Sequence, residues 1–269
     1  MMTQRNQSAR VEWDAVCYHR LSRPQFSWGQ KVLNRLRLRG DETVLDAGCG
    51  TGRLTVELAE RLPRGRVIAV DQSERMLRVA SDGLSPELGR RVGYVRADLR
   101  DLPLDGAVNL IFSTATLHWV RDQEQLFQSL FHALKPKGWL IAQCGGGPNL
   151  ARVLGRAQRI MVQPQYRQWF ANWSGPWEFA DAETAAGRLR RVGFADVSTS
   201  IEPAPAKLAD ANEYGEFLTN VIFHIHLARI PDEALRRSLI QTLVREAATD
   251  NPPFVCDYWR LNLTARRPR

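Results

Sequence analysis

A short apolar strand that runs directly into a glycine-rich turn constrains the fold of this chain more than any other feature. The segment 44–52 reads Val-Leu-Asp-Ala-Gly-Cys-Gly-Thr-Gly, and Leu54, Leu58 and Leu62 follow it at helical spacing. Glycine has no Cβ and readily adopts positive φ, so its backbone can approach a ligand closely. A strand, a glycine turn and a helix in this order are typical of the first part of a nucleotide-binding βαβ unit.

The second strand of that unit is also visible in the sequence. Residues 66–70 form a run rich in β-branched side chains, and the run ends at Asp71. An acidic residue about 20 positions after the glycines, at the end of the second strand, commonly binds the hydroxyls of a ribose. We therefore expect Asp71 to bind the sugar of a nucleoside.

Strands and helices alternate as far as residue 145, which predicts a parallel sheet covered by helices. Apolar residues at i, i+3 and i+4 indicate helices over about 52–62 and 126–134, and Ser73 is the expected N-cap of a third. A further helix is expected over 11–39. Strands are expected over 43–47, 66–70, 91–96, 107–112 and 139–143, and later over 194–201 and 255–266.

Composition excludes several classes of protein. The net charge of +8 first suggests a nucleic-acid partner. However, the arginines alternate with leucines, as in 33–39, or lie on helix faces, so we expect a solvated basic surface and no nucleic-acid partner. No apolar stretch approaches the ~20 residues of a membrane span, so no membrane partner is expected. The four cysteines lie far apart without CxxC spacing, which indicates reduced thiols in a cytoplasmic protein.

The glycine turn resembles motif I of the class I S-adenosylmethionine-dependent methyltransferases, which have a seven-stranded, Rossmann-like fold. The spacing Gly48-x-Gly50-x-Gly52 is the form found in that family, and the segments 40–43 and 134–138 are also similar to it. The sequence departs from the family at Asn109, where an aspartate is usual, and at Lys137, where a glycine is usual. Segments 114–120 and 257–262, with Trp13-Asp14 and Tyr18, resemble more narrowly the trans-aconitate methyltransferase group.

The resemblance implies an α/β fold with a seven-stranded, mostly parallel sheet, helices on both faces and an antiparallel last strand. Helical lid insertions are expected after strands five and six. The whole chain, 1–269, would form one methyltransferase domain. Its core would comprise 40–145, 181–201 and 255–266, and its lid segments 1–39, 149–180 and 210–248.

The resemblance also assigns roles to individual residues. S-adenosyl-L-methionine is the implied cofactor. Asp71 would accept hydrogen bonds from both ribose hydroxyls, Asp98 would accept from the adenine amino group, and Ser113 would face the methionyl chain. The full set expected at the cofactor is Asp46, Gly48, Cys49, Gly50, Gly52, Asp71, Gln72, Met76, Asp98, Leu99 and Ser113.

Tyr18, His118 and Trp119 are expected on the substrate side. His118 is the best-placed titratable group, but no catalytic residue is assigned with confidence, and His118 is only a weak candidate. His224 and His226 have no acidic or cysteine partner at metal spacing, so no metal is expected. Residues 251–254 read Asn-Pro-Pro-Phe, a tetrapeptide that binds the nitrogen nucleophile in amino-methyltransferases. Here it does not follow strand four, so we interpret it as a turn.

The expected reaction is methyl transfer to a small molecule by in-line displacement. O-methylation of a carboxylate fits best, because a carboxylate with a pKa of about 4 is already ionised at neutral pH and needs no general base. The expected partner is a small acidic substrate, and the protein is expected to be a monomer or a homodimer. The alternatives are methylation of another small molecule, of RNA or of a protein, and cofactor binding without turnover.

Overall fold

The computed structural model describes residues 12–269. Within that range seven strands form one sheet: β1 (Thr43–Ala47), β2 (Arg66–Asp71), β3 (Val92–Arg96), β4 (Val108–Thr114), β5 (Leu134–Gly145), β6 (Ala195–Pro203) and β9 (Trp259–Arg266). Their order is β3-β2-β1-β4-β5-β9-β6. The first five strands pair in parallel, and β9 lies antiparallel between β5 and β6. The predicted seven-stranded, mostly parallel sheet is confirmed.

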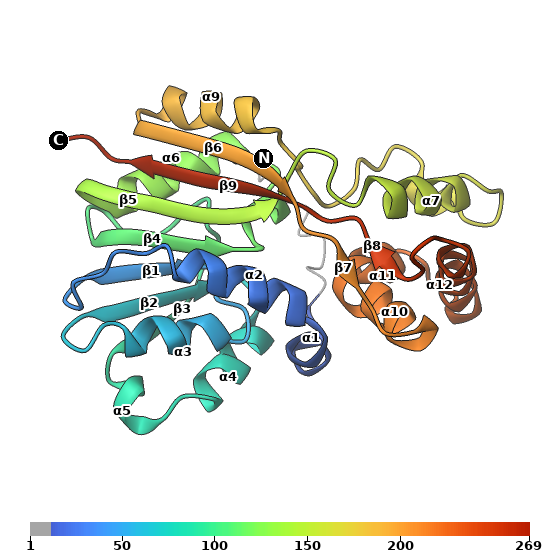
Figure 1. Cartoon of the computed structure of the whole chain (residues 1–269), viewed down its shortest axis with the longest axis horizontal. Coiled ribbons are helices and arrows are strands. Elements are labelled where there is room, and N and C mark those ends of the chain that lie inside the picture. The colour runs from blue at the N-terminus through green and yellow to red at the C-terminus, as the bar shows by residue number, and fades with distance from the viewer. Residues whose placement is uncertain (1–11) are drawn as a thin grey trace, which may run out of the picture.

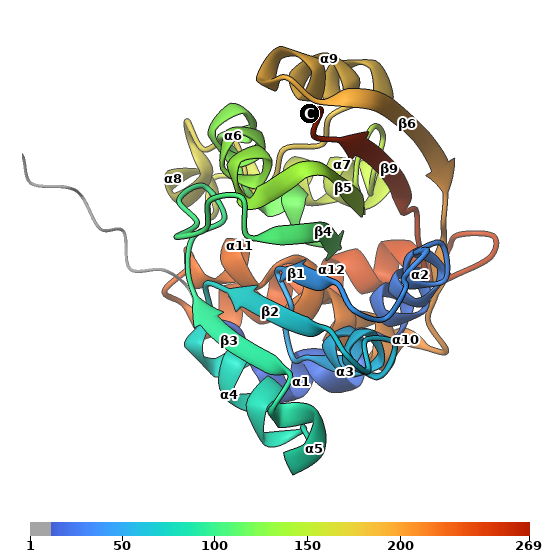
Figure 2. The same ribbon diagram turned by 90° about the vertical axis from the view of Figure 1, so that its left-hand side faces the viewer.

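Helices cover both faces of this sheet (Figures 1 and 2). On one face, α2 (Arg23–Leu33) and α3 (Arg53–Glu60) pack their leucines on alternate residues of β1, β2 and β4. On the other face, α6 (Gln123–Ala133) and α9 (Ala182–Val192) form a second apolar core with the strand residues that alternate with the first set, such as Leu45, Val70 and Ile111. Two further helices, α4 (Glu74–Asp82) and α5 (Pro86–Gly89), lie beside β3.

Local signals explain where several elements begin and end. The hydroxyl of Ser73 accepts a hydrogen bond from the Met76 amide at 3.2 Å, which confirms the predicted N-cap of α4. Gly193 adopts φ 109° at the end of α9, a conformation that glycine adopts without steric cost.

The single helix expected over 11–39 is wrong. The described part of that segment forms α1 (Ala15–Leu21) and α2, followed by an extended stretch, and residue 11 lies outside the described residues. Pro24 falls in the first turn of α2 and disfavours helix in the residue before it, so a new helix begins there. At its other end, Arg61 donates to the Leu33 carbonyl and to the Asn34 side chain, which satisfies the last turn from outside.

A helical lid lies beyond the end toward which the arrows of β4 and β5 point (Figure 1). Its elements are α7 (Ala151–Met161), α8 (Arg167–Phe170), α10 (Ala211–Phe217), a π-helical turn (Leu218–Ile222), α11 (His224–Ala228) and α12 (Glu233–Ala248). They share an apolar cluster separate from the two sheet cores. The predicted lid blocks at 149–180 and 210–248 therefore do lie together. Of the N-terminal lid segment, 1–39, residues 1–11 lie outside the described residues. Leu21 of α1 and Trp28 of α2 join the lid cluster, whereas Val32 and Leu33 at the end of α2 pack on the sheet.

The strand expected over 255–266 is divided. Only β9 joins the large sheet, whereas β8 (Val255–Cys256) pairs antiparallel with β7 (Ala206–Lys207) in a small ladder beside the lid. The chain therefore enters the last strand from the lid.

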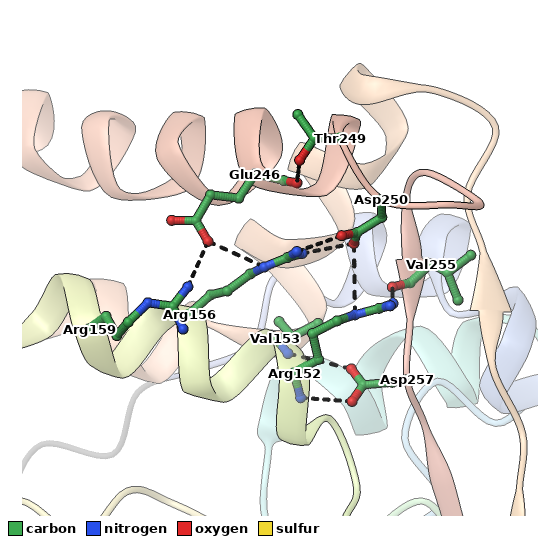
Figure 3. A network of polar contacts seen from close by, with 9 residues as sticks. All are labelled: Arg152, Val153, Arg156, Arg159, Glu246, Thr249, Asp250, Val255 and Asp257. Carbon is green, nitrogen blue, oxygen red and sulfur yellow. Dashed lines mark hydrogen bonds and ion pairs between the residues drawn. The ribbon is translucent and has the colours of Figure 1, made fainter.

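Ion pairs connect the two lid blocks (Figure 3). Arg156 on α7 donates to both carboxylate oxygens of Asp250, at 2.8 and 2.5 Å, and its Nε lies 3.2 Å from Glu246. The side chains of Arg156 and Asp250 are only 14% and 12% exposed. Because solvent screens buried charges less, this contact joins α7 firmly to the end of α12.

None of the helices within residues 12–269 combines the length and the apolar character needed to cross a bilayer.

Candidate functional site

A cavity of about 900 Å³ opens at the carboxyl ends of the parallel strands, beneath the lid. Open α/β sheets bind ligands at this edge. The roof comes from the lid, and includes Trp173, Ile225 and Arg229. Nine of the eleven residues expected at the cofactor line the cavity: Asp46, Gly48, Cys49, Gly50, Asp71, Gln72, Met76, Asp98 and Leu99.

The glycine turn forms the floor of the cavity. Gly48 has φ 83° and Gly50 has φ 54°, and a Cβ on Gly48 would lie 2.2 Å from the side chain of Thr116. The amides of Gly48 and Cys49 both donate to the Val70 carbonyl, which fixes the turn against β2. A Cβ on Gly50 would have no atom within 4 Å, so bare backbone at this position faces open space. Gly48 is thus required for packing, and Gly50 leaves room for a ligand.

Two carboxylates stand in this cavity. Asp46 is buried and accepts a hydrogen bond from the Thr55 hydroxyl at 2.6 Å, while Asp71 accepts from the amides of Gly50 and Ser73 at 3.0 and 2.8 Å. Burial raises the pKa of Asp46 to about 7, with the nearby charge of Asp71 adding to the rise. Burial likewise raises the pKa of Asp71. A cationic ligand would relieve this concentration of negative charge.

S-adenosylmethionine fits this donor and acceptor set. Its sulfonium and ammonium groups are cations, and the two carboxylates provide the negative charge to match them. Asp71 retains lone pairs for a ribose diol, since a carboxylate can accept about four hydrogen bonds. The bare backbone of Gly50 leaves room for close approach. Cys49 would be a packing residue, because burial raises the pKa of its thiol well above the usual value.

The expected adenine side of the cavity combines apolar residues with Gln72, Asp98 and Arg100. Met76 and Leu99 are buried and line it. The Asp98 carboxylate accepts from Arg100 at 3.0 and 2.7 Å through the side chain and at 3.0 Å through the amide. These bonds fix the orientation of Asp98, and its role toward an adenine amino group stays a prediction.

Two expected cofactor residues have other contacts. Gly52 does not line the cavity: a Cβ there would lie 2.8 Å from Ala80 Cβ, so the glycine allows α3 to approach α4. Ser113 is fully buried, and its hydroxyl donates to the Ala47 carbonyl at 2.7 Å, which ties β4 to β1. Their neighbours Thr51 and Thr114 line the cavity instead.

A small recess of about 30 Å³ adjoins the cavity on the lid side. Trp13, Tyr18, Gln25, Ala115 and Trp119 line both spaces, so the recess opens into the cavity. The predicted substrate residues Tyr18 and Trp119 thus lie at the junction, whereas His118 lines the recess alone.

His118 is held as a hydrogen-bond donor. The Gly145 amide donates to its Nδ1 at 3.2 Å, so the proton of the neutral ring lies on Nε2. Burial lowers the pKa of His118 well below its usual value, with the charge of Arg260 as a second cause. A neutral ring whose only free nitrogen carries a proton is a poor general base. The geometry therefore favours a role for His118 in binding.

Arg260 is the site residue that sequence reasoning missed. It lies on β9 next to Gly145, is only 2% exposed and lines the recess. Its Nη2 is buried and has no hydrogen-bond partner. The segment 257–262, which includes Arg260, carries the resemblance to the trans-aconitate group, and that resemblance was the available signal.

Aromatic rings build the walls of the recess and tie it to the lid. Trp13 packs edge-on against Trp119 with ring centroids 5.3 Å apart, and His224 of α11 lies 3.7 Å from Trp13. Trp177 packs on Trp119 from the other side. The lid therefore contributes directly to the substrate side of the site.

Among residues 12–269, no group of three or more histidine, cysteine or acidic side chains is arranged to hold a metal ion. The tetrapeptide 251–254 lies in the bend after α12, where residues 251–253 are exposed and Phe254 packs against the lid, and it does not line the cavity or the recess.

Comparison with known proteins gives several methyltransferases. Residues 44–138 match the family described as a methyltransferase domain. A trans-aconitate 2-methyltransferase of Variovorax paradoxus is 36% identical over 137 residues, which cover 49% of this chain and 50% of that protein. The chain spans about half the length of the first such relatives. The match to a trans-aconitate 2-methyltransferase of Paracidovorax citrulli is longer: it is 31% identical over 194 residues and covers 71% of this chain and 68% of that protein.

Solved structures share the fold. Phosphoethanolamine N-methyltransferase 2 of Haemonchus contortus, in complex with S-adenosyl-L-methionine, has a TM-score of 0.59 at 17% identity. The similarity covers 95% of this chain and 57% of that one. At this identity the match supports the fold, while the Paracidovorax protein extends the relationship over most of a whole sequence. The chain belongs to the class I S-adenosylmethionine-dependent methyltransferase family.

Proposed function

We propose that this protein is an enzyme that transfers the methyl group of S-adenosyl-L-methionine to a carboxylate oxygen of a small acid. The observation that carries the proposal is the buried guanidinium of Arg260, whose Nη2 lacks a partner in a recess that adjoins the cofactor cavity. A buried cation without a counter-ion is costly, and an acidic substrate would neutralise it.

The residues of the cavity would hold the cofactor, which supplies an electrophilic methyl group on sulfonium. Asp71 would bind the ribose, and Asp46 would balance positive charge. Trp119 and Tyr18 would align the acid at the junction and keep water away, and alignment alone can supply roughly 7–11 kcal/mol. No general base is needed, because a carboxylate is ionised at neutral pH. The donor geometry of His118 agrees with such a reaction.

The relatives support an acidic substrate. The trans-aconitate 2-methyltransferases are named for a small acid, and the proteins of Variovorax paradoxus and Paracidovorax citrulli are 36% and 31% identical to this chain over 137 and 194 residues. We also propose that the protein acts in the cytoplasm, where its four free cysteines would stay reduced.

The test incubates the purified chain with methyl-labelled cofactor and a panel of small acids, phenols, amines and RNA. The proposal predicts label on acids only, released as methanol by mild alkali, as a methyl ester requires. Alkali-stable label on RNA, a phenol or an amine would refute the carboxylate assignment. Tight cofactor binding without any product would favour a non-catalytic role, and no cofactor binding in equilibrium dialysis would overturn the proposal as a whole.

A further inference from the structure

Arg260 is held rigidly, and one side of its guanidinium is left open. Its Nε lies 3.4 Å from the Gln143 side-chain oxygen, and its Cζ lies 4.7 Å from the centre of the Trp28 ring. Gln143 is itself fixed by a 2.8 Å bond to Asn262. These contacts orient the side chain, while Nη2 remains without a partner. A fixed planar guanidinium is well suited to recognise a carboxylate.

No carboxylate of the described residues forms an ion pair with Arg260, and Glu202, its neighbour across β6 and β9, interacts with it only beyond ion-pair distance. Among residues 12–269, none of the ion pairs includes Arg260. Burial lowers the pKa of Arg260, as expected for a desolvated cation. A buried cation without an ion-pair partner is costly, and this indicates a ligand of opposite charge.

The recess beside Arg260 has about the size of one carboxylate group. Its volume of about 30 Å³ compares with the ~10–15 Å³ needed for one water molecule on the same measure. His118 lines the same recess, and its protonated Nε2 is available as a second donor. The recess therefore suits one carboxylate group, with the rest of the ligand extending toward the cavity.

Arg260 lines the recess but not the cofactor cavity, whereas the junction between the two is lined by neutral groups. These are the side chains of Trp13, Tyr18, Gln25, Ala115 and Trp119. A full ion pair with Arg260 would withdraw negative charge from a reacting oxygen, but weaker neutral donors would leave it nucleophilic. The carboxylate that pairs with Arg260 and the carboxylate that is methylated are therefore best taken as two different groups of the substrate.

On this basis we infer that Arg260 is a specificity-determining residue that anchors a carboxylate which is not methylated. The inference rests on the proposed function and narrows its substrate class to short acids with at least two carboxylates. One carboxylate binds Arg260 and His118, and another lies at the junction. An oxygen of the second forms a bond to the methyl carbon as the carbon–sulfur bond breaks, and the electron pair of that bond stays on sulfur. No proton is transferred, and the product is a monoester.

The experiment compares glutarate with pentanoate, which have the same chain length but differ in the second carboxylate. The wild-type protein should methylate glutarate with a kcat/KM at least about 30-fold higher, the ratio for one buried charge-paired contact. Arg260→Met should abolish this preference by lowering the glutarate value alone, and Arg260→Lys should restore part of it. Arg190→Gln removes an exposed arginine on α9 and serves as the control for a general change of charge.

Binding provides a second readout. With S-adenosylhomocysteine bound, glutarate should change the fluorescence of the recess tryptophans in the wild type but not in Arg260→Met, and pentanoate should bind weakly to both. Cofactor affinity should be unchanged in the variant, because Arg260 does not line the cofactor cavity.

The assignment of Arg260 as an anchor would be overturned if the wild type had equal kcat/KM values for glutarate and pentanoate. It would also be overturned if Arg260→Met lowered both values by the same factor. If esters form without dependence on Arg260, the anchor fails and the proposed function stands. If no acid is methylated but glutarate binding still depends on Arg260, the proposed function fails and the acid-binding site stands.

Discussion

Cofactor affinity should depend on pH through Asp46. Burial raises the pKa of this carboxyl to about 7, and the nearby Asp71 charge adds to the rise. A cationic ligand favours the ionised form, so binding should release a proton and should strengthen as pH rises. With a pKa near 7, about nine-tenths of the carboxyl is ionised at pH 8 and about one-tenth at pH 6. If only the ionised form binds tightly, affinity should fall about ninefold across this range, or about 1.3 kcal/mol.

Isothermal titration with S-adenosylmethionine at pH 6, 7 and 8 measures this dependence directly. Repeating the pH 7 titration in buffers with different ionisation enthalpies counts the protons released. Asp46→Asn should bind more weakly at pH 8 and lose the pH dependence, whereas Asp105→Asn, which alters an exposed loop acid, should keep both. Equal wild-type affinities at pH 6 and pH 8, with no proton released, would refute the reasoning.

Three further predictions concern stability. Arg156→Ala should lower the unfolding free energy by about 2–3 kcal/mol, because the nearly buried Asp250 loses both hydrogen bonds from Arg156 and keeps only the ion pair with Arg152 at 3.7 Å. Arg159→Ala, at a side chain that is 66% exposed, should change it by less than about 0.5 kcal/mol, and chemical denaturation compares the two variants. Lys137 has φ 68° at an exposed position within β5, so Lys137→Gly should stabilise the fold by about 1 kcal/mol and raise the Tm by about 2–4 °C in calorimetry. Burial lowers the pKa of His226 to about 3, so the unfolded chain takes up a proton below pH 6.5 that the folded chain does not. Stability should therefore fall between pH 6.5 and about 3, and His226→Phe should make denaturation midpoints less dependent on pH there.

The local sequence was sufficient to predict the sheet and most of the residues that line the cofactor cavity. The run 44–52 specifies a strand and a turn almost by itself, because its glycines have few alternatives to positive φ. Asp71 could be placed from its distance to that turn. The positions of Gly52 and Ser113 were harder to predict, because the neighbouring helix and strand determine which side of the turn or strand faces a ligand. Gly52 contacts α4, and Ser113 bonds to β1.

The substrate side depends on long-range packing. Arg260 becomes buried only because β9 inserts between β5 and β6 and because the lid covers its end. His118 could be recognised as a candidate, but its hydrogen bond from Gly145 joins residues on different elements, and that bond decides which nitrogen carries the proton. Neither periodicity nor spacing along the chain contains these relationships.

The measurement that tests the central claim most directly is mass spectrometry of the products formed from glutarate and trideuteromethyl-labelled cofactor. The account predicts a labelled glutarate monomethyl ester from the wild-type protein and a loss of that product in Arg260→Met, with cofactor affinity retained. A wild-type protein that binds the cofactor but leaves every dicarboxylate and monocarboxylate unlabelled would contradict it.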